Sequence, residues 1–164
     1  TEAAYLNVIR SKTAKLFEAS ARLAPVLAGC SAEIETACAD YGQALGTAFQ
    51  VIDDVLDYDG DAAEMGKNLG DDLREGKVTL PLIIAMQRGT EAQCALIRNA
   101  IEIGETDNLS AVIEIVKTTG ALDATREAAA VQAQLAIDAI AGLPDNVYTA
   151  GLLQLAASLL TRRI

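Results

Sequence analysis

Three aspartates near the middle of the chain have the spacing of a cation site. Asp53 and Asp54 stand four and three residues before Asp57, directly after a largely apolar run. On a helix this spacing places the three carboxylates on one broad face, where like charges repel one another unless a ligand compensates them. Mg²⁺ takes oxygen ligands and commonly joins one or two carboxylates to substrate phosphates. The spacing therefore indicates a magnesium site, with a solvated acidic surface as the alternative.

The same region holds most of the net charge of the chain. Positions 53–72 contain eight acidic side chains and one base, so they carry seven of the ten net negative charges in 164 residues. An acidic chain repels nucleic-acid phosphates, which argues against a nucleic-acid partner. The absence of histidine excludes histidine triads and histidine-containing zinc sites. An EF-hand is also excluded, because a loop with Gly60 at its glycine position would place Val55 and Gly66 at ligand positions.

Basic side chains flank the acidic cluster in the sequence. Lys67 and Lys77 each follow a glycine shortly beyond the aspartates. A lysine is a mobile point charge for phosphate, and glycine lets the backbone approach a ligand closely. Lys12 and Thr13 lie among apolar positions nearer the start of the chain. For Lys12 the alternative is an ordinary surface lysine whose stem covers apolar neighbours.

The elements that must position these residues are helices. Alanine, leucine and isoleucine dominate, and glycines fall where helices end. We predict helices over 2–27, 31–58, 79–88, 90–104, 108–118, 121–141 and 146–163, and a loop over 60–76. Pro25 predicts a kink or an early end of the first helix, and Thr90 with Gln93 predicts a capping box.

Apolar residues make up 51% of the chain, at the upper edge of the range for soluble domains. In the first helix an apolar stripe runs through Tyr5, Ile9, Leu16, Leu23 and Leu27. We expect surplus apolar surface that packs against a further part of the protein or a partner. No run approaches the ~20 residues that span a bilayer, so no transmembrane segment is expected. Three separated cysteines favour reduced thiols and a cytoplasmic location.

Three segments together resemble the trans-isoprenyl diphosphate synthases, and most closely the long-chain polyprenyl members of bacteria that make quinone side chains. Residues 46–58 (GTAFQVIDDVLDY) and 66–82 (GKNLGDDLREGKVTLPL) resemble the second aspartate-rich region of that family, and residues 5–20 (YLNVIRSKTAKLFEAS) resemble its Lys-Thr helix. The resemblance covers essentially the whole chain. It implies an all-α fold in which residues 1–164 form the C-terminal part of a single helical bundle of the isoprenoid-synthase type.

The resemblance also implies a reaction and its site residues. The family joins isopentenyl diphosphate to an allylic diphosphate, head to tail and repeatedly, with Mg²⁺ held between two aspartate-rich motifs, and its members are usually homodimers. By position, the implied metal ligands are Asp53, Asp54 and Asp57, and Asp53 is the foremost of them. The implied diphosphate-binding lysines are Lys12 and Lys67, and the implied neighbours of the cationic centre are Thr13, Phe49 and Gln50. Lys77, Asp71 and Asp72 match a loop that closes the pocket, and Lys77 has a supporting role there in substrate binding.

One departure from the family limits what this sequence can do. The first aspartate-rich motif should precede Thr1 and is absent from the sequence, so we expect the 164 residues alone to be inactive and the complete chain to be a synthase. The alternatives are a non-catalytic subunit of a heteromeric synthase, a terpene cyclase and an acidic structural domain. Retention of all three aspartates favours a catalytic chain over a non-catalytic subunit. The lysine-bearing loop and the segment at 76–81 favour elongation over cyclisation.

Overall fold

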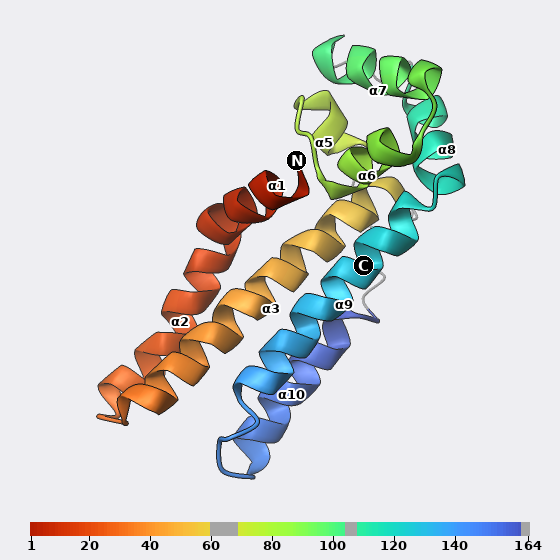
Figure 1. The fold of residues 1–164 in the computed structure, drawn as a ribbon. Coiled ribbons are helices and arrows are strands. Elements are labelled where there is room, and N and C mark those ends of the chain that lie inside the picture. Colours follow the sequence, from red (N-terminus) through yellow and green to blue (C-terminus); the bar gives the residue numbers. More distant parts are fainter. Residues whose placement is uncertain (60–68, 104–107, 162–164) are drawn as a thin grey trace. The chain divides into compact units, whose positions relative to one another are not determined.

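A computed structural model describes residues 1–59, 69–103 and 108–161, and these residues form helices without any strand. The helices are α1 (Glu2–Ile9), the π-helical η1 (Arg10–Ala14), α2 (Lys15–Leu27), α3 (Ala32–Asp59), α5 (Asp71–Arg74), α6 (Leu80–Arg88), α7 (Glu91–Ile103), α8 (Leu109–Thr118), α9 (Ala121–Ala139) and α10 (Val147–Leu159) (Figure 1). The all-α class predicted from the sequence is confirmed.

Most helix ends lie where the local sequence signals place them. At the start of α7, the backbone N–H of Thr90 donates to Gln93 Oε1 at 2.8 Å, and the N–H of Gln93 donates to Thr90 Oγ1 at 3.3 Å. This is the predicted capping box, which satisfies two backbone donors that have no partner within the helix. Pro81 lies in the first turn of α6, where a missing N–H costs nothing.

Two of the predicted elements differ from the structure. The predicted helix over 2–27 is interrupted by the π-helical residues 10–14, whereas α2 runs through Pro25 and ends two residues later. The predicted loop over 60–76 contains the short helix α5, and positions 60–68 lie outside the described residues. Residues of both segments bond to distant positions: Thr13 donates to Gln50, and the first backbone N–H groups of α5 donate to Asp57.

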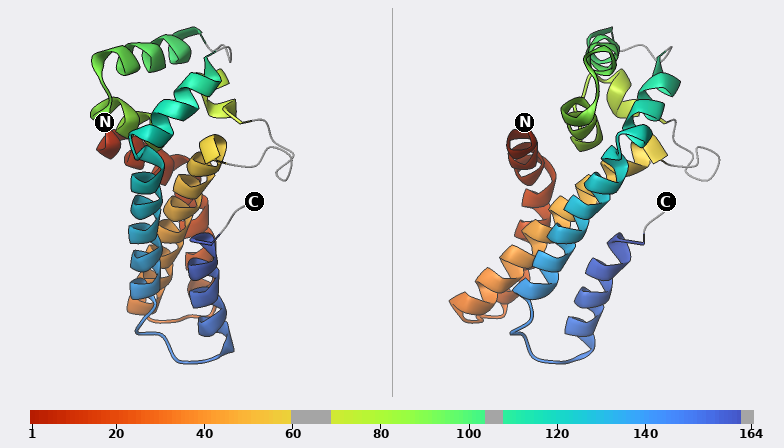
Figure 2. Two further views of the ribbon diagram at one scale, coloured as in Figure 1. Left: turned by 90° about the vertical axis from the view of Figure 1, so that its right-hand side faces the viewer. Right: turned by 45° about the vertical axis from the view of Figure 1, so that its right-hand side comes forward.

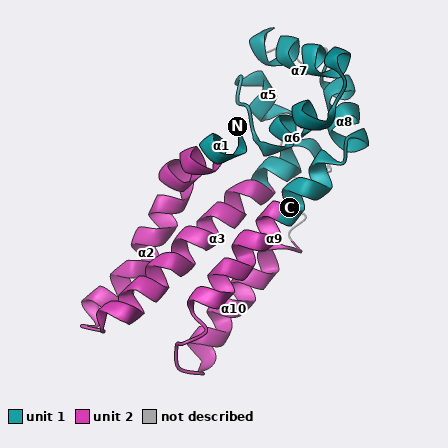
Figure 3. Cartoon of the chain, in the orientation of Figure 1, with its two compact units in different colours: residues 1–5, 53–127, 163–164 teal, residues 6–52, 128–162 magenta. Residues whose placement is uncertain are grey.

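The chain divides into two compact units, and three of the described helices, α1, α3 and α9, have residues in both (Figure 3). Unit 1 comprises residues 1–5, 53–127 and 163–164, and unit 2 comprises residues 6–52 and 128–162. In unit 1, helices α5 to α8 surround buried leucine, isoleucine and valine side chains. The fully buried ones are Leu73, Leu80, Leu82, Ile97, Val112 and Val116.

Unit 2 is built on close packing between small residues. Figures 1 and 2 show α2 beside the first part of α3, and α9 beside α10. A Cβ atom added at Gly46 would lie 2.7 Å from Ala14 Cα, and one added at Gly42 would lie 2.5 Å from the carbonyl oxygen of Phe17. Only glycine permits that approach. On the other side of α3, Tyr41, Leu45 and Ala48 pack in one core with residues of α9 and α10.

The apolar stripe predicted for the first helix is buried at its beginning and exposed further along. Tyr5 and Ile9 are buried, whereas Leu16, Leu23 and Leu27 are 72%, 55% and 78% exposed. The described chain therefore carries apolar surface along α2, as the composition predicted. None of the described helices is long and apolar enough to cross a membrane.

Candidate functional site

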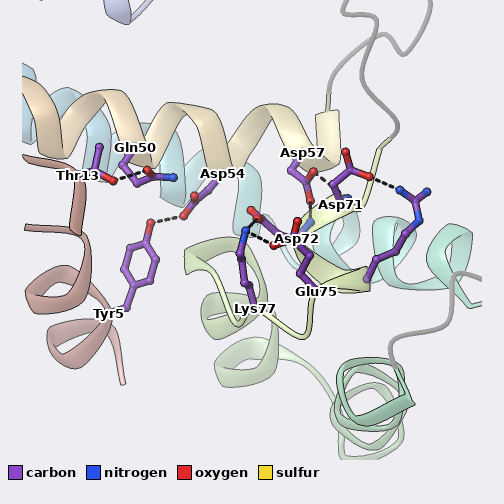
Figure 4. Close-up of polar contacts among 10 residues, drawn as sticks. Tyr5, Thr13, Gln50, Asp54, Asp57, Asp71, Asp72, Glu75 and Lys77 are labelled. Atoms are coloured by element: carbon purple, nitrogen blue, oxygen red, sulfur yellow. Dashed lines mark hydrogen bonds and ion pairs between the residues drawn. The ribbon is translucent and has the colours of Figure 1, made fainter. Parts of the chain in front are cut away.

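Asp54, on the last two turns of α3, is the most deeply buried acidic side chain in the described part of the chain. It is 1% exposed, and its Oδ2 accepts a hydrogen bond from the hydroxyl of Tyr5, which belongs to the same unit (Figure 4). Burial, together with the negative charge of Asp54, raises the pKa of the Tyr5 phenol. The phenol therefore stays protonated at neutral pH and remains a donor. A buried carboxylate without donors is costly, so this bond helps Asp54 to be accommodated in the interior.

Asp57 has a different set of partners. Its Oδ1 accepts the backbone N–H of Asp71 at 3.1 Å, and its Oδ2 accepts the N–H of Asp72 at 3.2 Å (Figure 4). The Asp57 carbonyl oxygen also accepts the N–H of Gly70 at 3.0 Å. A carboxylate is favourable at a helix start, where backbone N–H groups lack partners. Asp57 thus ties the start of α5 to the end of α3.

The electrostatic surroundings of Asp57 are unfavourable to its charge. Burial, followed by the negative charge of Asp72, raises the pKa of Asp57 to about 6, although the backbone N–H groups of α5 act in the opposite direction. Excess negative charge is therefore concentrated where α3 and α5 meet. Such a place favours a cationic partner.

Lys77 supplies part of that positive charge. Its Nζ lies 3.3 Å from Asp72 Oδ1 and 2.5 Å from Glu75 Oε2, and the hydrogen bond to Glu75 leads the causes that raise its pKa. The side chain is exposed, so these ion pairs contribute little to stability and are readily exchanged for other anions. The second predicted lysine of this region, Lys67, lies outside the described residues.

Asp53, the foremost predicted metal ligand, is half-buried on the same end of α3. Within residues 1–59, 69–103 and 108–161, no three acidic, cysteine or histidine side chains are arranged together to hold a metal ion. Magnesium sites in which substrate phosphates complete the coordination need only one or two carboxylates from the protein. Asp53 therefore has the donor chemistry for that mode of binding.

The predicted neighbours of the cationic centre lie in unit 2. The hydroxyl of Thr13 donates to Gln50 Oε1 at 2.8 Å, which joins η1 to α3 (Figure 4). Phe49 packs against Phe17 with ring centroids 5.5 Å apart. Lys12 is exposed on η1. π-Helical segments are rare and often occur at functional sites, so the interruption of the first helix coincides with its predicted functional residues.

Sequence reasoning missed one polar partner in this region. Tyr5 was assigned only to the apolar stripe, yet its hydroxyl reaches Asp54 across 49 positions of sequence. Only the burial of Asp54, which then needs a hydrogen-bond donor, could have suggested this partner. The spacing of residues in the sequence does not show burial. The interpretation of Asp54 and Asp57 as metal ligands also did not anticipate that Tyr5 and α5 engage them.

The chain is similar to known proteins over its whole length. Residues 1–119 match the family model described as polyprenyl synthetase. The chain is 50% identical over 157 residues to octaprenyl diphosphate synthase of Escherichia coli, which covers 95% of this chain and 49% of that protein. It is 44% identical over 162 residues to the geranyl-diphosphate-specific all-trans-nonaprenyl-diphosphate synthase of Rhodobacter capsulatus, covering 99% of this chain and 50% of the relative.

Solved structures of other proteins are also similar to this chain. A polyprenyl synthase from Caulobacter crescentus, complexed with calcium and isoprenyl diphosphate, superposes with a TM-score of 0.93 at 40% identity, covering 100% of this chain and 51% of that one. A decaprenyl diphosphate synthase from Rhodobacter capsulatus superposes with a TM-score of 0.90 at 42% identity and the same coverage. The chain thus spans about half the length of the curated relatives it matches.

Proposed function

The chain belongs to the polyprenyl synthetase family, and we propose that it is the C-terminal part of a long-chain all-trans polyprenyl diphosphate synthase. In this proposal the whole protein elongates an allylic diphosphate with isopentenyl diphosphate. Relatives that make octaprenyl and nonaprenyl diphosphates support long products for the whole protein. Because the chain spans about half of those relatives, we propose that the 164 residues alone are inactive.

The observation that carries the proposal is the carboxylate-bearing end of α3. Asp53 lies there beside two aspartates that are held in place by Tyr5 and by the backbone of α5. The similar structure from Caulobacter crescentus was solved with calcium and isoprenyl diphosphate, which supports a divalent cation and a diphosphate as ligands of the proposed synthase.

The donor chemistry of this end of α3 fits magnesium. Carboxylate oxygens are the ligands that Mg²⁺ prefers, so Asp53 would hold the ion foremost, with Asp54 and Asp57 as further candidates. When bound, Mg²⁺ neutralises negative charge on the departing diphosphate. The proposed contacts of the chain with the diphosphates themselves are Lys12, Lys67 and Lys77.

Unit 2 contributes the proposed stabilisation of positive charge. The reaction forms a carbon–carbon bond between the two substrates, with loss of diphosphate and then of a proton. The oxygen atoms of Thr13 and Gln50 are joined by a hydrogen bond, so their dipoles are fixed before substrate binds. Fixed oxygen dipoles stabilise developing positive charge better than water that must reorient. Phe49 is the proposed aromatic wall of the same site.

The assay uses radiolabelled isopentenyl diphosphate with Mg²⁺ and an allylic diphosphate. The whole protein is expected to yield labelled polyprenyl diphosphate, and the 164-residue chain is expected to yield no more than a blank without enzyme. Product from the chain alone would contradict the proposed inactivity. No product from the whole protein would contradict the synthase.

The same assay separates the alternatives. A cyclic hydrocarbon from the allylic substrate alone would indicate a terpene cyclase, and activity that appears only with a second polypeptide would indicate a non-catalytic subunit. We further propose a homodimer in the cytoplasm. Sedimentation of the whole protein at twice its monomer mass supports the dimer, and a monomer at assay concentration contradicts it.

A further inference from the structure

The buried side chain of Tyr5 lies in an apolar stripe, where an apolar side chain would fill the space equally well. The side chain is 8% exposed and belongs to the apolar stripe of α1. Its hydroxyl is nevertheless used, because it donates to Oδ2 of Asp54 on α3 (Figure 4). The bond joins two helices far apart in sequence, and it ends on the carboxylate next to Asp53.

That contact constrains the direction in which α3 presents its neighbouring side chains. Successive residues of an α-helix are rotated by about 100° around the helix axis. Holding Asp54 in the interior therefore turns Asp53 to a set direction beside it. On the following turn, Asp57 is held by the backbone N–H groups of Asp71 and Asp72. Asp53 thus stands next to Asp54 and one turn before Asp57, so both of the carboxylates nearest to it on the helix are anchored, one of them by Tyr5.

We propose that Tyr5 is a positioning residue, which through its hydrogen bond to Asp54 orients the end of α3 so that Asp53 faces the metal-bound diphosphate. The inference rests on the proposed function, because it supposes that Asp53 binds a metal and a diphosphate. Tyr5 itself touches neither ligand. Its effect is expected on the affinity for the ligand, and less on the stability of the fold.

The test removes the hydroxyl of Tyr5 and keeps its aromatic ring. In the whole protein, Tyr5→Phe removes the donor while preserving the packing of the aromatic side chain. The measurement is calorimetric titration with inorganic pyrophosphate in the presence and absence of Mg²⁺. We expect the Mg²⁺-dependent Kd for pyrophosphate to rise about tenfold in Tyr5→Phe, because carboxylates that Tyr5 no longer orients must be ordered when the ligand binds.

Tyr41→Phe is the matched control. Tyr41 is also buried, and its hydroxyl also donates one hydrogen bond, to the carbonyl oxygen of Leu152 at 2.8 Å. It lies on α3 as well, but in unit 2 and more than three turns before the aspartates. We expect Tyr41→Phe to lower the unfolding midpoint measured in EDTA and to leave the affinity for pyrophosphate unchanged. A role of Tyr5 in packing alone would make the two variants behave alike.

A double-mutant cycle tests whether Tyr5 acts through Asp54. Asp54→Asn removes the buried negative charge that the Tyr5 hydroxyl accommodates. The protein should therefore tolerate Tyr5→Phe when Asp54→Asn is also present. The double variant is expected to fold even where Tyr5→Phe alone does not. We expect Tyr5→Phe to weaken pyrophosphate binding less than twofold when Asp54 is already asparagine. An undiminished tenfold effect in that background would mean that Tyr5 acts independently of Asp54, and it would overturn the proposal.

Measurements on the unmodified protein separate a failure of the proposed function from a failure of the proposed role of Tyr5. If it shows no Mg²⁺-dependent binding of pyrophosphate, the proposed function fails. If it binds pyrophosphate and Tyr5→Phe binds equally well, the proposed function stands and the role of Tyr5 is refuted.

Discussion

Helix α3 is held by apolar packing along residues 42–48 and by directed polar contacts along residues 53–59. In the first region Gly42 and Gly46 lie directly against α2, and Leu45 and Ala48 pack in the core of unit 2. In the second region, buried or half-buried carboxylates accept hydrogen bonds from Tyr5 and from the start of α5. One helix therefore combines a stretch that depends on shape with a stretch that depends on charge and direction.

This difference separates stability from the proposed chemistry. The hydrophobic effect behind close packing is non-directional, and the loss of that packing lowers the free energy of unfolding. Hydrogen bonds to buried carboxylates are directional, so besides stabilising the fold they fix where the charges point. We therefore expect substitutions in the first region to lower global stability, and substitutions in the second region to alter ligand binding or the local stability of α5. The four predictions below test that division.

The largest effect is expected at Asp53. In the whole protein, Asp53→Ala should lower turnover by orders of magnitude, because it removes the foremost proposed metal ligand, while the unfolding midpoint in EDTA changes little. Steady-state kinetics with a Mg²⁺ titration measures the effect. The matched control is Asp59→Ala, which removes an exposed carboxylate paired with Arg126 and Lys117 at the end of the same helix and is expected to leave turnover close to unmodified. Similar losses in both variants would remove the special role of Asp53.

The next effect is expected at Gly46. Gly46→Ala places a Cβ atom 2.7 Å from Ala14 Cα, so η1 and α3 must separate. We expect the free energy of unfolding to fall by about 1–3 kcal/mol, the usual cost of overpacking. Urea unfolding followed by circular dichroism measures it. Gly151→Ala on α10 is the control, since a Cβ atom there meets nothing within 4 Å, and it should stabilise the helix by about 0.5–1 kcal/mol. Equal stability of the two variants would contradict the close packing.

A smaller effect is expected at Asp57. Asp57→Ala removes the acceptor of two backbone N–H groups of α5, so the free energy that holds this short helix should fall by about 1–2 kcal/mol. Amide hydrogen exchange at Asp71 and Asp72 should accelerate by roughly tenfold. Asp57→Asn retains one carbonyl oxygen and should protect Asp71 or Asp72, but not both. Unchanged exchange in Asp57→Ala would show that α5 does not depend on this carboxylate.

The smallest effect at neutral pH is expected at Tyr41. Burial raises the pKa of Tyr41 to about 12, above the value of ~10 for an exposed tyrosine. The unfolded state therefore ionises first, so the stabilisation due to Tyr41 is fully present below pH ~10 and is lost as the pH rises toward 12. At pH 8, Tyr41→Phe should be less stable by about 1 kcal/mol. Urea unfolding between pH 8 and 11.5 should show this gap closing.

Exposed Tyr148 provides the reference for that pH series. Its side chain is 82% exposed, so Tyr148→Phe should be as stable as the unmodified protein at pH 8. A constant gap between Tyr41→Phe and the unmodified protein across the series would contradict the raised pKa of Tyr41.

Local signals in the sequence were sufficient for most of the fold. The end of α3, the proline in the first turn of α6 and the Thr90–Gln93 capping box follow from residues within a few positions of one another. Thr13 donates a hydrogen bond to Gln50, and their role beside a cationic centre stays a prediction. The π-helical segment and α5 do not follow from local signals, and both bond to distant residues, Thr13 to Gln50 and the start of α5 to Asp57.

For this protein, the sequence by itself determined the helical class, the family resemblance and the position of the acidic cluster, because periodicity, capping and spacing are local properties. The tertiary structure alone decided how the three carboxylates differ. Asp54 is buried against Tyr5, Asp57 accepts the backbone N–H groups of α5, and Asp53 is half-buried next to Asp54. Spacing treats the three aspartates alike, whereas burial and hydrogen-bond partners depend on which distant segments fold against each one.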